Sequence, residues 1–166
     1  MDVNALAAKL SDPAANVRTE AAEALAHLAE GAQAAAVPLV QAMGDADEDV
    51  RNWALAALES LGPPRIEDAP ALSKLAADPR LDVAYWAVML LGRLGGAELP
   101  APSHILTTLI TALNTHAEIV VRQRAAWALG QFGPAANAAI DSLTKAGSSS
   151  DPRLARLANE AIGEIH

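Results

Sequence analysis

The stretch "DVRNWALAALESLG", residues 49–62, decides the fold of this chain. Its apolar residues recur three and four positions apart, which is the period of an amphipathic helix. Thirty-three residues later, "DVAYWAVMLLGRLG" (82–95) repeats the pattern with a Trp at the same place. An Ala-rich helix that twice accepts the bulkiest side chain at one position indicates that this position faces away from the tight core.

The same pattern occurs five times, with spacings of 33, 33, 38 and 33 residues between equivalent positions. The position that aligns the repeats is occupied by Val17, Val50, Val83, Val121 and Leu154. The sequence therefore predicts one repeat domain over 1–166, with units at approximately 2–31, 32–63, 66–96, 103–133 and 135–166.

Each unit contains a short and a long helical segment. A turn rich in Asp, Ser and Pro separates the two segments, and these residues favour the start of a helix. The long segments end at signals such as "LGPP" (61–64) and "FGP" (132–134), where Gly followed by Pro stops a helix. Helical hairpins of this size cannot bury their apolar faces alone, so stacking into an α-solenoid is expected.

Composition supports an all-α fold and excludes several function classes. The 166 residues are 52% hydrophobic but only 3% aromatic, which suits closely packed helices better than a sheet. A net charge of −8 disfavours binding to nucleic-acid phosphates and to anionic membranes. With no Cys there are no disulfides or thiolate metal sites. We expect a soluble protein, cytoplasmic by default, with no signal peptide or membrane span.

The turn and the start of the long helix carry a family resemblance. An Asp five residues before the aligned Val, then Val-Arg, then small residues ending in Leu and Gly, resembles the HEAT repeat, in the short form named after phycobilisome lyases. Asp12 with Arg18 and Asp45 with Arg51 fit this pattern fully. The later units depart from it at one or both positions, through Ala84, His116 and Ala155.

The resemblance implies a right-handed α-solenoid whose second helices line the concave side. It also implies that the Asp and Arg side chains tie adjacent repeats together, so this ladder should be intact early in the chain and interrupted later. HEAT-like solenoids serve many purposes, and the resemblance therefore specifies the fold far better than the function.

The face of the long helices opposite the core changes character in the middle units. It carries Thr and Glu in the first unit, but all three Trp and the single Tyr in the next three. Such patches mark binding sites. The predicted partner-binding residues are Asn52, Trp53, Tyr85, Trp86, Met89, Arg93, Gln123, Arg124, Trp127 and Gln131. The alternative is that Trp53 and Trp86 lie flat between adjacent helices and fill space there.

Charge on this face changes along the chain. The early units carry acids, and the later units carry arginines balanced by two glutamates. The residues concerned are Glu20, Glu23, Glu48, Asp49, Arg93, Arg124, Arg153, Arg156, Glu160 and Glu164. A groove of this kind would orient a dipolar partner such as a helix or an extended peptide. An ordinary mixed surface is the alternative.

These observations predict a non-catalytic scaffold that binds a protein or peptide, with no cofactor. The four His residues lack a metal-ligand spacing, and no nucleophile or phosphate-binding motif is present. The resemblance leaves two enzyme alternatives, a bilin lyase-like protein that handles a chromophore and a HEAT-like DNA glycosylase, which the acidic charge disfavours. Self-association through the Trp patch and a structural module of a longer protein remain further alternatives.

Two linkers break the regularity of the repeats. "GPPRIEDAP" (62–70) and "GGAELPAPSH" (95–104) differ in length and composition, which is untypical of an engineered array of identical repeats. The second is the five-residue expansion of the third unit. It either overhangs one edge of the groove or is a neutral insertion.

Overall fold

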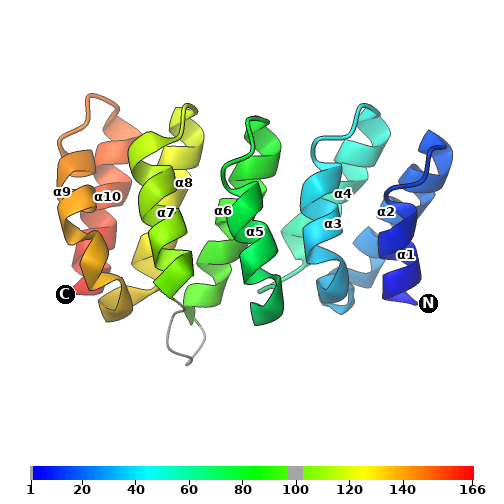
Figure 1. The fold of residues 1–166 in the computed structure, drawn as a ribbon, viewed down its shortest axis with the longest axis horizontal. Coiled ribbons are helices and arrows are strands. Elements are labelled where there is room, and N and C mark those ends of the chain that lie inside the picture. The colour runs from blue at the N-terminus through cyan, green and yellow to red at the C-terminus, as the bar shows by residue number, and fades with distance from the viewer. Residues whose placement is uncertain (1, 97–102) are drawn as a thin grey trace. The chain divides into compact units, whose positions relative to one another are not determined.

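The computed structural model describes residues 2–96 and 103–166, and this part of the chain is helical without strands. It forms helical hairpins whose second helix is longer than the first, except in the fourth hairpin, where both helices have 13 residues (Figure 1). The first helices are α1 (Val3–Lys9), α3 (Ala36–Ala42), α5 (Ala69–Leu75), α7 (Ser103–Thr115) and α9 (Ile140–Gly147). The second helices are α2 (Ala15–Leu28), α4 (Glu48–Ser60), α6 (Leu81–Arg93), α8 (Ile119–Gln131) and α10 (Pro152–Ile165). The predicted all-α solenoid class is confirmed.

Short 3-10 segments connect successive hairpins. They are η1 (Ala29–Ala35), η2 (Ile66–Asp68), η3 (Leu94–Gly96) and η4 (Gly133–Ala139). Most of the predicted insertion at 95–104 lies outside the described residues, so its two interpretations stay predictions.

The described helices group into two compact units by their contacts, and the single repeat domain over 1–166 stays a prediction. One unit runs up to Ala71 and the other begins at Leu72, so the boundary falls inside α5. Gly62, Pro63 and Pro64 precede this boundary in irregular backbone, because proline lacks the N–H that would extend α4.

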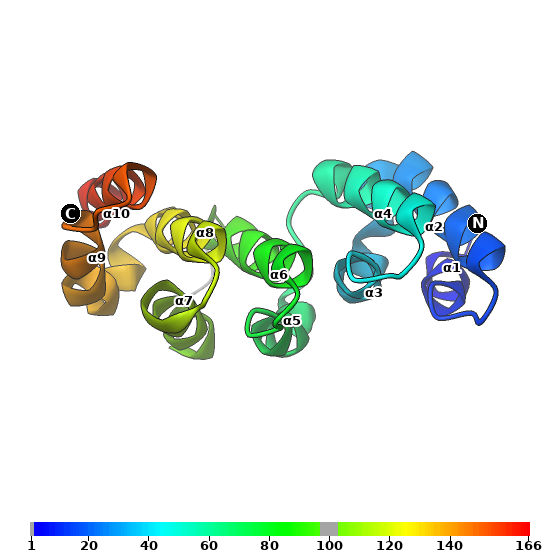
Figure 2. The same ribbon diagram turned by 90° about the horizontal axis from the view of Figure 1, so that it is seen from above.

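Each unit has two layers. In the N-terminal unit α2 packs beside α4, and α1 and α3 form the layer behind them (Figure 2). In the C-terminal unit α6, α8 and α10 lie side by side in that order, and α7 and α9 pack against them (Figure 2). We call the outer side of the α6, α8 and α10 layer the second-helix face.

The core between the layers is built from Leu and Ala. Leu25, Leu39 and Leu58 are fully buried in the N-terminal unit, as are Leu109 and Leu129 in the C-terminal unit. The many buried alanines let neighbouring helices approach closely, and removing such apolar area from water drives the stacking.

The long helices end as the sequence predicts. Gly62 and Gly133 have φ angles of 73° and 50°, the left-handed region that favours glycine. Ala29 is the equivalent residue of the first repeat and has a φ of 47° without being a glycine. This repeat therefore stores strain at its helix end.

The turn inside each hairpin is fastened in the same way in all five repeats. The residue five positions before the aligned position accepts a hydrogen bond from the backbone N–H two residues later, at 2.8–3.2 Å. The accepting residues are Asp12, Asp45, Asp78, His116 and Ser149. The turn thus survives where the family's Asp is replaced, because His and Ser also offer an acceptor.

The predicted ladder is present between the first two repeats. Arg18 donates from Nε and Nη2 to the two carboxylate oxygens of Asp45, both at 2.8 Å. This bidentate pair holds the pKa of Asp45 below its usual value, chiefly through the hydrogen bond from Arg18. In the last two repeats an amide–carboxylate hydrogen bond takes its place, because Gln123 Nε2 donates to Asp151 at 2.9 Å.

Candidate functional site

Aromatic and cationic side chains meet on the second-helix face of the C-terminal unit. Tyr85, Trp86 and Arg93 come from α6, and Arg124 and Trp127 come from α8. We call these five residues the cation–aromatic cluster. Because residues three or four apart share one side of a helix, Met89 lies on the same row as Tyr85 and Arg93.

Arg124 is the centre of the cluster. Its guanidinium carbon lies 5.0 Å from the ring centroid of Tyr85 and 5.1 Å from that of Trp127. Nη2 donates a 2.7 Å hydrogen bond to the Tyr85 hydroxyl, whereas Nε is buried without a hydrogen-bond partner. Two cation–π contacts and one hydrogen bond therefore fix this guanidinium in place.

The second guanidinium of the cluster is partly desolvated. The guanidinium carbon of Arg93 lies 5.7 Å from the ring centroid of Trp86. The rings of Tyr85 and Trp86 are arranged edge to face, with their centroids 5.9 Å apart. Burial lowers the pKa of Arg93, and repulsion from the positive charge of Arg124 lowers it further. The cluster therefore concentrates positive charge against aromatic walls.

A hollow lies beside Trp127, between α8 and α10. Its volume is about 130 Å³. Trp127, Gly130 and Gln131 line it from α8, and Leu157, Glu160, Ala161 and Glu164 line it from α10. Glu160 accepts a 2.6 Å bond from Arg156 on the same helix. The hollow thus has both apolar and polar lining residues, and it shares Trp127 with the cation–aromatic cluster.

Two predicted site residues are buried, which corrects the expectation that this face is open throughout. Trp86 is 6% exposed and Gln123 is 7% exposed. Trp86 is covered because Tyr85 meets its ring and the long side chain of Arg93 lies over it. Gln123 is buried because it reaches across to Asp151, which caps α10.

The remaining predicted residues divide between the two units. Asn52 is exposed and Trp53 half-buried on α4 of the N-terminal unit, where the ring of His27 lies 5.9 Å from that of Trp53. In the C-terminal unit Tyr85, Met89, Arg93, Arg124 and Trp127 are half-buried, and Gln131 is exposed. The C-terminal unit therefore gathers most of the predicted site.

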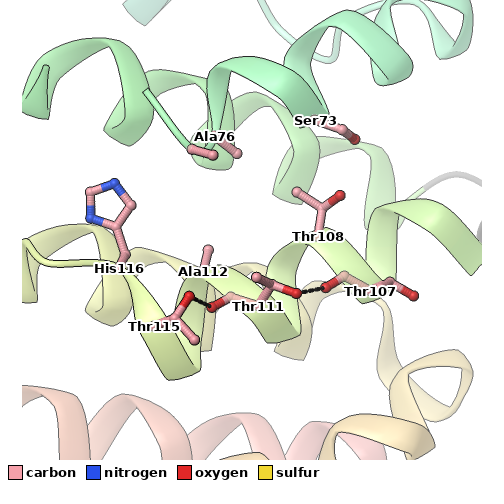
Figure 3. Close-up of a pocket in the computed structure, with 9 residues that line it drawn as sticks. Ser73, Ala76, Thr107, Thr108, Thr111, Ala112, Thr115 and His116 are labelled. Atoms are coloured by element: carbon pink, nitrogen blue, oxygen red, sulfur yellow. Dashed lines mark hydrogen bonds between the residues drawn. The ribbon is translucent and has the colours of Figure 1, made fainter. Parts of the chain in front are cut away.

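A second pocket lies on the opposite side of the C-terminal unit, and the sequence reasoning missed it. Its volume is about 200 Å³. Figure 3 shows threonines of α7 facing Ser73 and Ala76. The signal was available in "ILTTLITALNTH" (105–116), where Thr residues recur at helical spacing. Each hydroxyl of Thr107, Thr108, Thr111 and Thr115 bonds to a carbonyl of its own helix, which leaves methyl groups to line the pocket.

Among residues 2–96 and 103–166, no group of three His, Asp or Glu side chains is placed to hold a metal ion. The helices of this described part are also too short or too polar to cross a membrane.

Comparison with protein families agrees with the repeat pattern. A model of HEAT repeats matches residues 3–92 and 69–163, so the two matches together span nearly the whole sequence. The chain belongs to the HEAT repeat family. This identification confirms the resemblance that the turn and long-helix residues indicate. A comparison of this HEAT-repeat protein with curated proteins found no match.

Solved structures similar to this HEAT-repeat protein include designed and natural solenoids. An engineered protein is 23% identical over 99% of this chain and 80% of its own length, with a TM-score of 0.66. A designed armadillo repeat protein in complex with the peptide (KR)4 is 21% identical over 99% and 82%, with a TM-score of 0.67. The complex of CpcE and CpcF of phycocyanin lyase from Nostoc sp. PCC7120 is 20% identical over 99% and 65%, with a TM-score of 0.66. At these identities the likeness concerns the fold.

Proposed function

We propose that this chain is a non-catalytic scaffold that binds a peptide segment of a partner protein on the second-helix face of its C-terminal unit. The observation that carries the proposal is the position of Arg124, held between Tyr85 and Trp127, together with the hollow that Trp127 also lines. Arg, Tyr and Trp are the residues that contribute most binding energy in interfaces.

Preorganisation supports this assignment. Arg124 is already immobilised by Tyr85 and Trp127, so a partner would not have to order this long side chain on binding. The adjacent hollow offers space for one apolar side chain of the peptide. A fixed polar anchor next to a partly apolar hollow is a common arrangement in recognition sites.

The similar structures add support at the level of architecture. A designed armadillo repeat protein of the same fold has been solved with a peptide bound. The likeness to the phycocyanin lyase complex is at 20% identity and supports only the fold, and the acidic charge of the chain disfavours the glycosylase alternative. We therefore favour peptide binding over both enzyme alternatives.

The test begins with selection of short peptides from a random display library on the full chain. Affinities of the selected peptides are then measured by calorimetry for the unmodified chain, Trp127→Ala and Gln131→Ala. Loss of a buried aromatic contact is expected to weaken binding about tenfold or more for Trp127→Ala. Gln131 is exposed at the hollow, so Gln131→Ala provides a smaller, fold-preserving loss.

The control is Thr107→Ala, an exposed substitution on α7 in the pocket on the opposite side. It should leave the affinity unchanged. If peptide affinity falls in Thr107→Ala and not in Trp127→Ala, the binding site lies elsewhere and the proposal is overturned. Sedimentation over a range of concentrations separates peptide binding from self-association, and a dimer that dissociates in Trp127→Ala would also overturn it.

A further inference from the structure

The two units differ sharply in charge. Residues 1–71 contain 12 acidic and 4 basic side chains, whereas residues 72–166 contain 8 of each. The entire net charge of −8 therefore belongs to the N-terminal unit. The cation–aromatic cluster lies in the neutral unit, where an anionic ligand meets no net repulsion from its own surroundings.

Arg93 and Arg124 carry like charges over two aromatic rings, Trp86 and Tyr85, whose centroids are 5.9 Å apart, so the two charges disfavour one another. Among residues 2–96 and 103–166, no carboxylate forms an ion pair with Arg124, whose hydrogen bond goes to the neutral hydroxyl of Tyr85. Partly buried arginines are usually paired with an anion, because desolvation of the charge costs free energy. In the described part of the chain, no carboxylate therefore balances the positive charge of Arg124.

The hydrogen-bonding capacity of Arg124 indicates how an anion would bind. A guanidinium has five N–H donors, of which Tyr85 takes one on Nη2 and the enclosed Nε uses none. The Nη1 edge therefore remains for an incoming acceptor. A carboxylate there would form charge-assisted hydrogen bonds and would relieve the repulsion between Arg124 and Arg93.

Building on the proposed function, we infer that the partner peptide is acidic, with an Asp or Glu carboxylate bound by Arg124. The apolar side chain next to that acid enters the hollow beside Trp127. Glu160 and Glu164 line the hollow from α10, so they disfavour a second acid in the hollow itself. Tyr85 is a positioning residue that holds the guanidinium through its hydroxyl.

The experiment uses peptides selected on the full chain and their synthetic analogues in which each acid is replaced by its amide. We expect Asp and Glu to be enriched in the selection. The acid form should bind about tenfold tighter than the amide form, because hydrogen bonds to charged groups are the stronger ones. The difference should shrink as salt is added, since the site is partly exposed.

Variants of the chain identify the group that reads the carboxylate. In Arg124→Gln the acid and amide peptides should bind alike, and Arg93→Gln should reduce the difference partly. Arg124→Lys keeps the positive charge but loses the planar set of guanidinium N–H donors, so it should retain only part of the preference for the acid peptide over the amide peptide. Tyr85→Phe removes the hydroxyl and should also lower the preference, while circular dichroism reports that the helices are intact.

The outcomes separate this inference from the proposed function. Peptides that lose affinity in Trp127→Ala but bind equally well as acid and amide would overturn the inference and leave the peptide-binding scaffold intact. An acid preference that survives Arg124→Gln would overturn it as well. If no peptide is enriched above background, the proposed function fails and the inference fails with it.

Discussion

The indole of Trp127 on α8 lies directly over Gly92 on α6, where a Cβ atom would come within 2.7 Å of the ring carbon Cζ3. The same Cβ would come within 2.8 Å of the Cβ of Ala128. Gly92 therefore sets both the distance between these helices and the position of the aromatic ring. The cluster around Arg124 depends on a residue that has no side chain at all.

This relationship predicts that Gly92→Ala is destabilising. The added methyl group would clash with the Trp127 ring and with Ala128, so α6 and α8 must separate or the Trp127 ring must move. Overpacking of this kind typically costs about 1–3 kcal/mol. Urea denaturation followed by circular dichroism measures the loss, and the tryptophan emission should shift at the same time.

Gly163 provides the matched control, since it lies in α10 and a Cβ there would meet nothing within 4 Å. Gly163→Ala should raise stability by up to about 1 kcal/mol through helix propensity alone. Equal effects of the two substitutions would show that the contact with Trp127 does not limit the space at Gly92.

The end of α2 predicts a stabilising substitution. Ala29 has a φ of 47° at the position where later repeats have Gly62 and Gly133. Ala29→Gly should relieve this strain and raise the free energy of unfolding by about 1 kcal/mol, measured by thermal or urea denaturation. Ala8→Gly, on the exposed side of α1, is the control and should be destabilising by a similar amount. A loss of stability in Ala29→Gly would contradict the strained helix end.

The Arg18–Asp45 pair predicts a pH dependence. The pKa of Asp45 is lower in the folded chain than in the unfolded chain, where it is about 3.9. The pair therefore stabilises the fold above that value, and the stabilisation is lost as pH falls through the lower folded pKa. Asp45→Asn should lower the melting temperature by several degrees at pH 7 and by much less near pH 3.

The control for this comparison is Glu59→Gln, a substitution of an exposed acid on α4. It should change the melting temperature little at pH 7. A difference between Asp45→Asn and the unmodified chain that persists undiminished into acid would mean that packing, and not the ion pair with Arg18, makes Asp45 stabilising.

Burial predicts how the three tryptophans respond to a quencher. Variants that keep one Trp and replace the other two by Phe isolate each emission. The Trp86-only variant should emit at shorter wavelength and be quenched least by acrylamide, because this side chain is 6% exposed. The Trp53-only and Trp127-only variants should be quenched more readily, since both rings are half-buried. Equal quenching of all three would contradict the burial of Trp86.

Much of the fold could be predicted from the repeat alone. Helix periodicity, Asp and Ser turns and Gly-Pro stops all act within a few residues of one another, so the hairpins are visible without tertiary information. For the same reason the sequence predicts helix ends at Gly62 and Gly133, which have positive φ angles in the structure. The division near Ala71 was not, because it depends on how contacts are distributed between repeats.

The candidate site could be predicted only in outline. Helical angle placed Tyr85, Arg124 and Trp127 on one side of their helices, but it could not foresee that Arg93 covers Trp86. Whether Arg93 covers Trp86 depends on the side-chain conformations and on the spacing of α6 and α8, which Gly92 sets. The rung from Gln123 to Asp151 was missed because it lies one position away from the Arg of the family pattern.

The most direct test of peptide binding at the cation–aromatic cluster is an NMR titration of the labelled full chain with a selected peptide, in which the three indole N–H signals and the Arg side-chain signals are observed. We expect the signals of Trp127 and Arg124 to shift strongly and saturate together, while the signals of residues in the threonine-lined pocket, such as Thr111, do not move. Shifts confined to that pocket or to Trp53, with Trp127 and Arg124 unchanged at saturation, would contradict it.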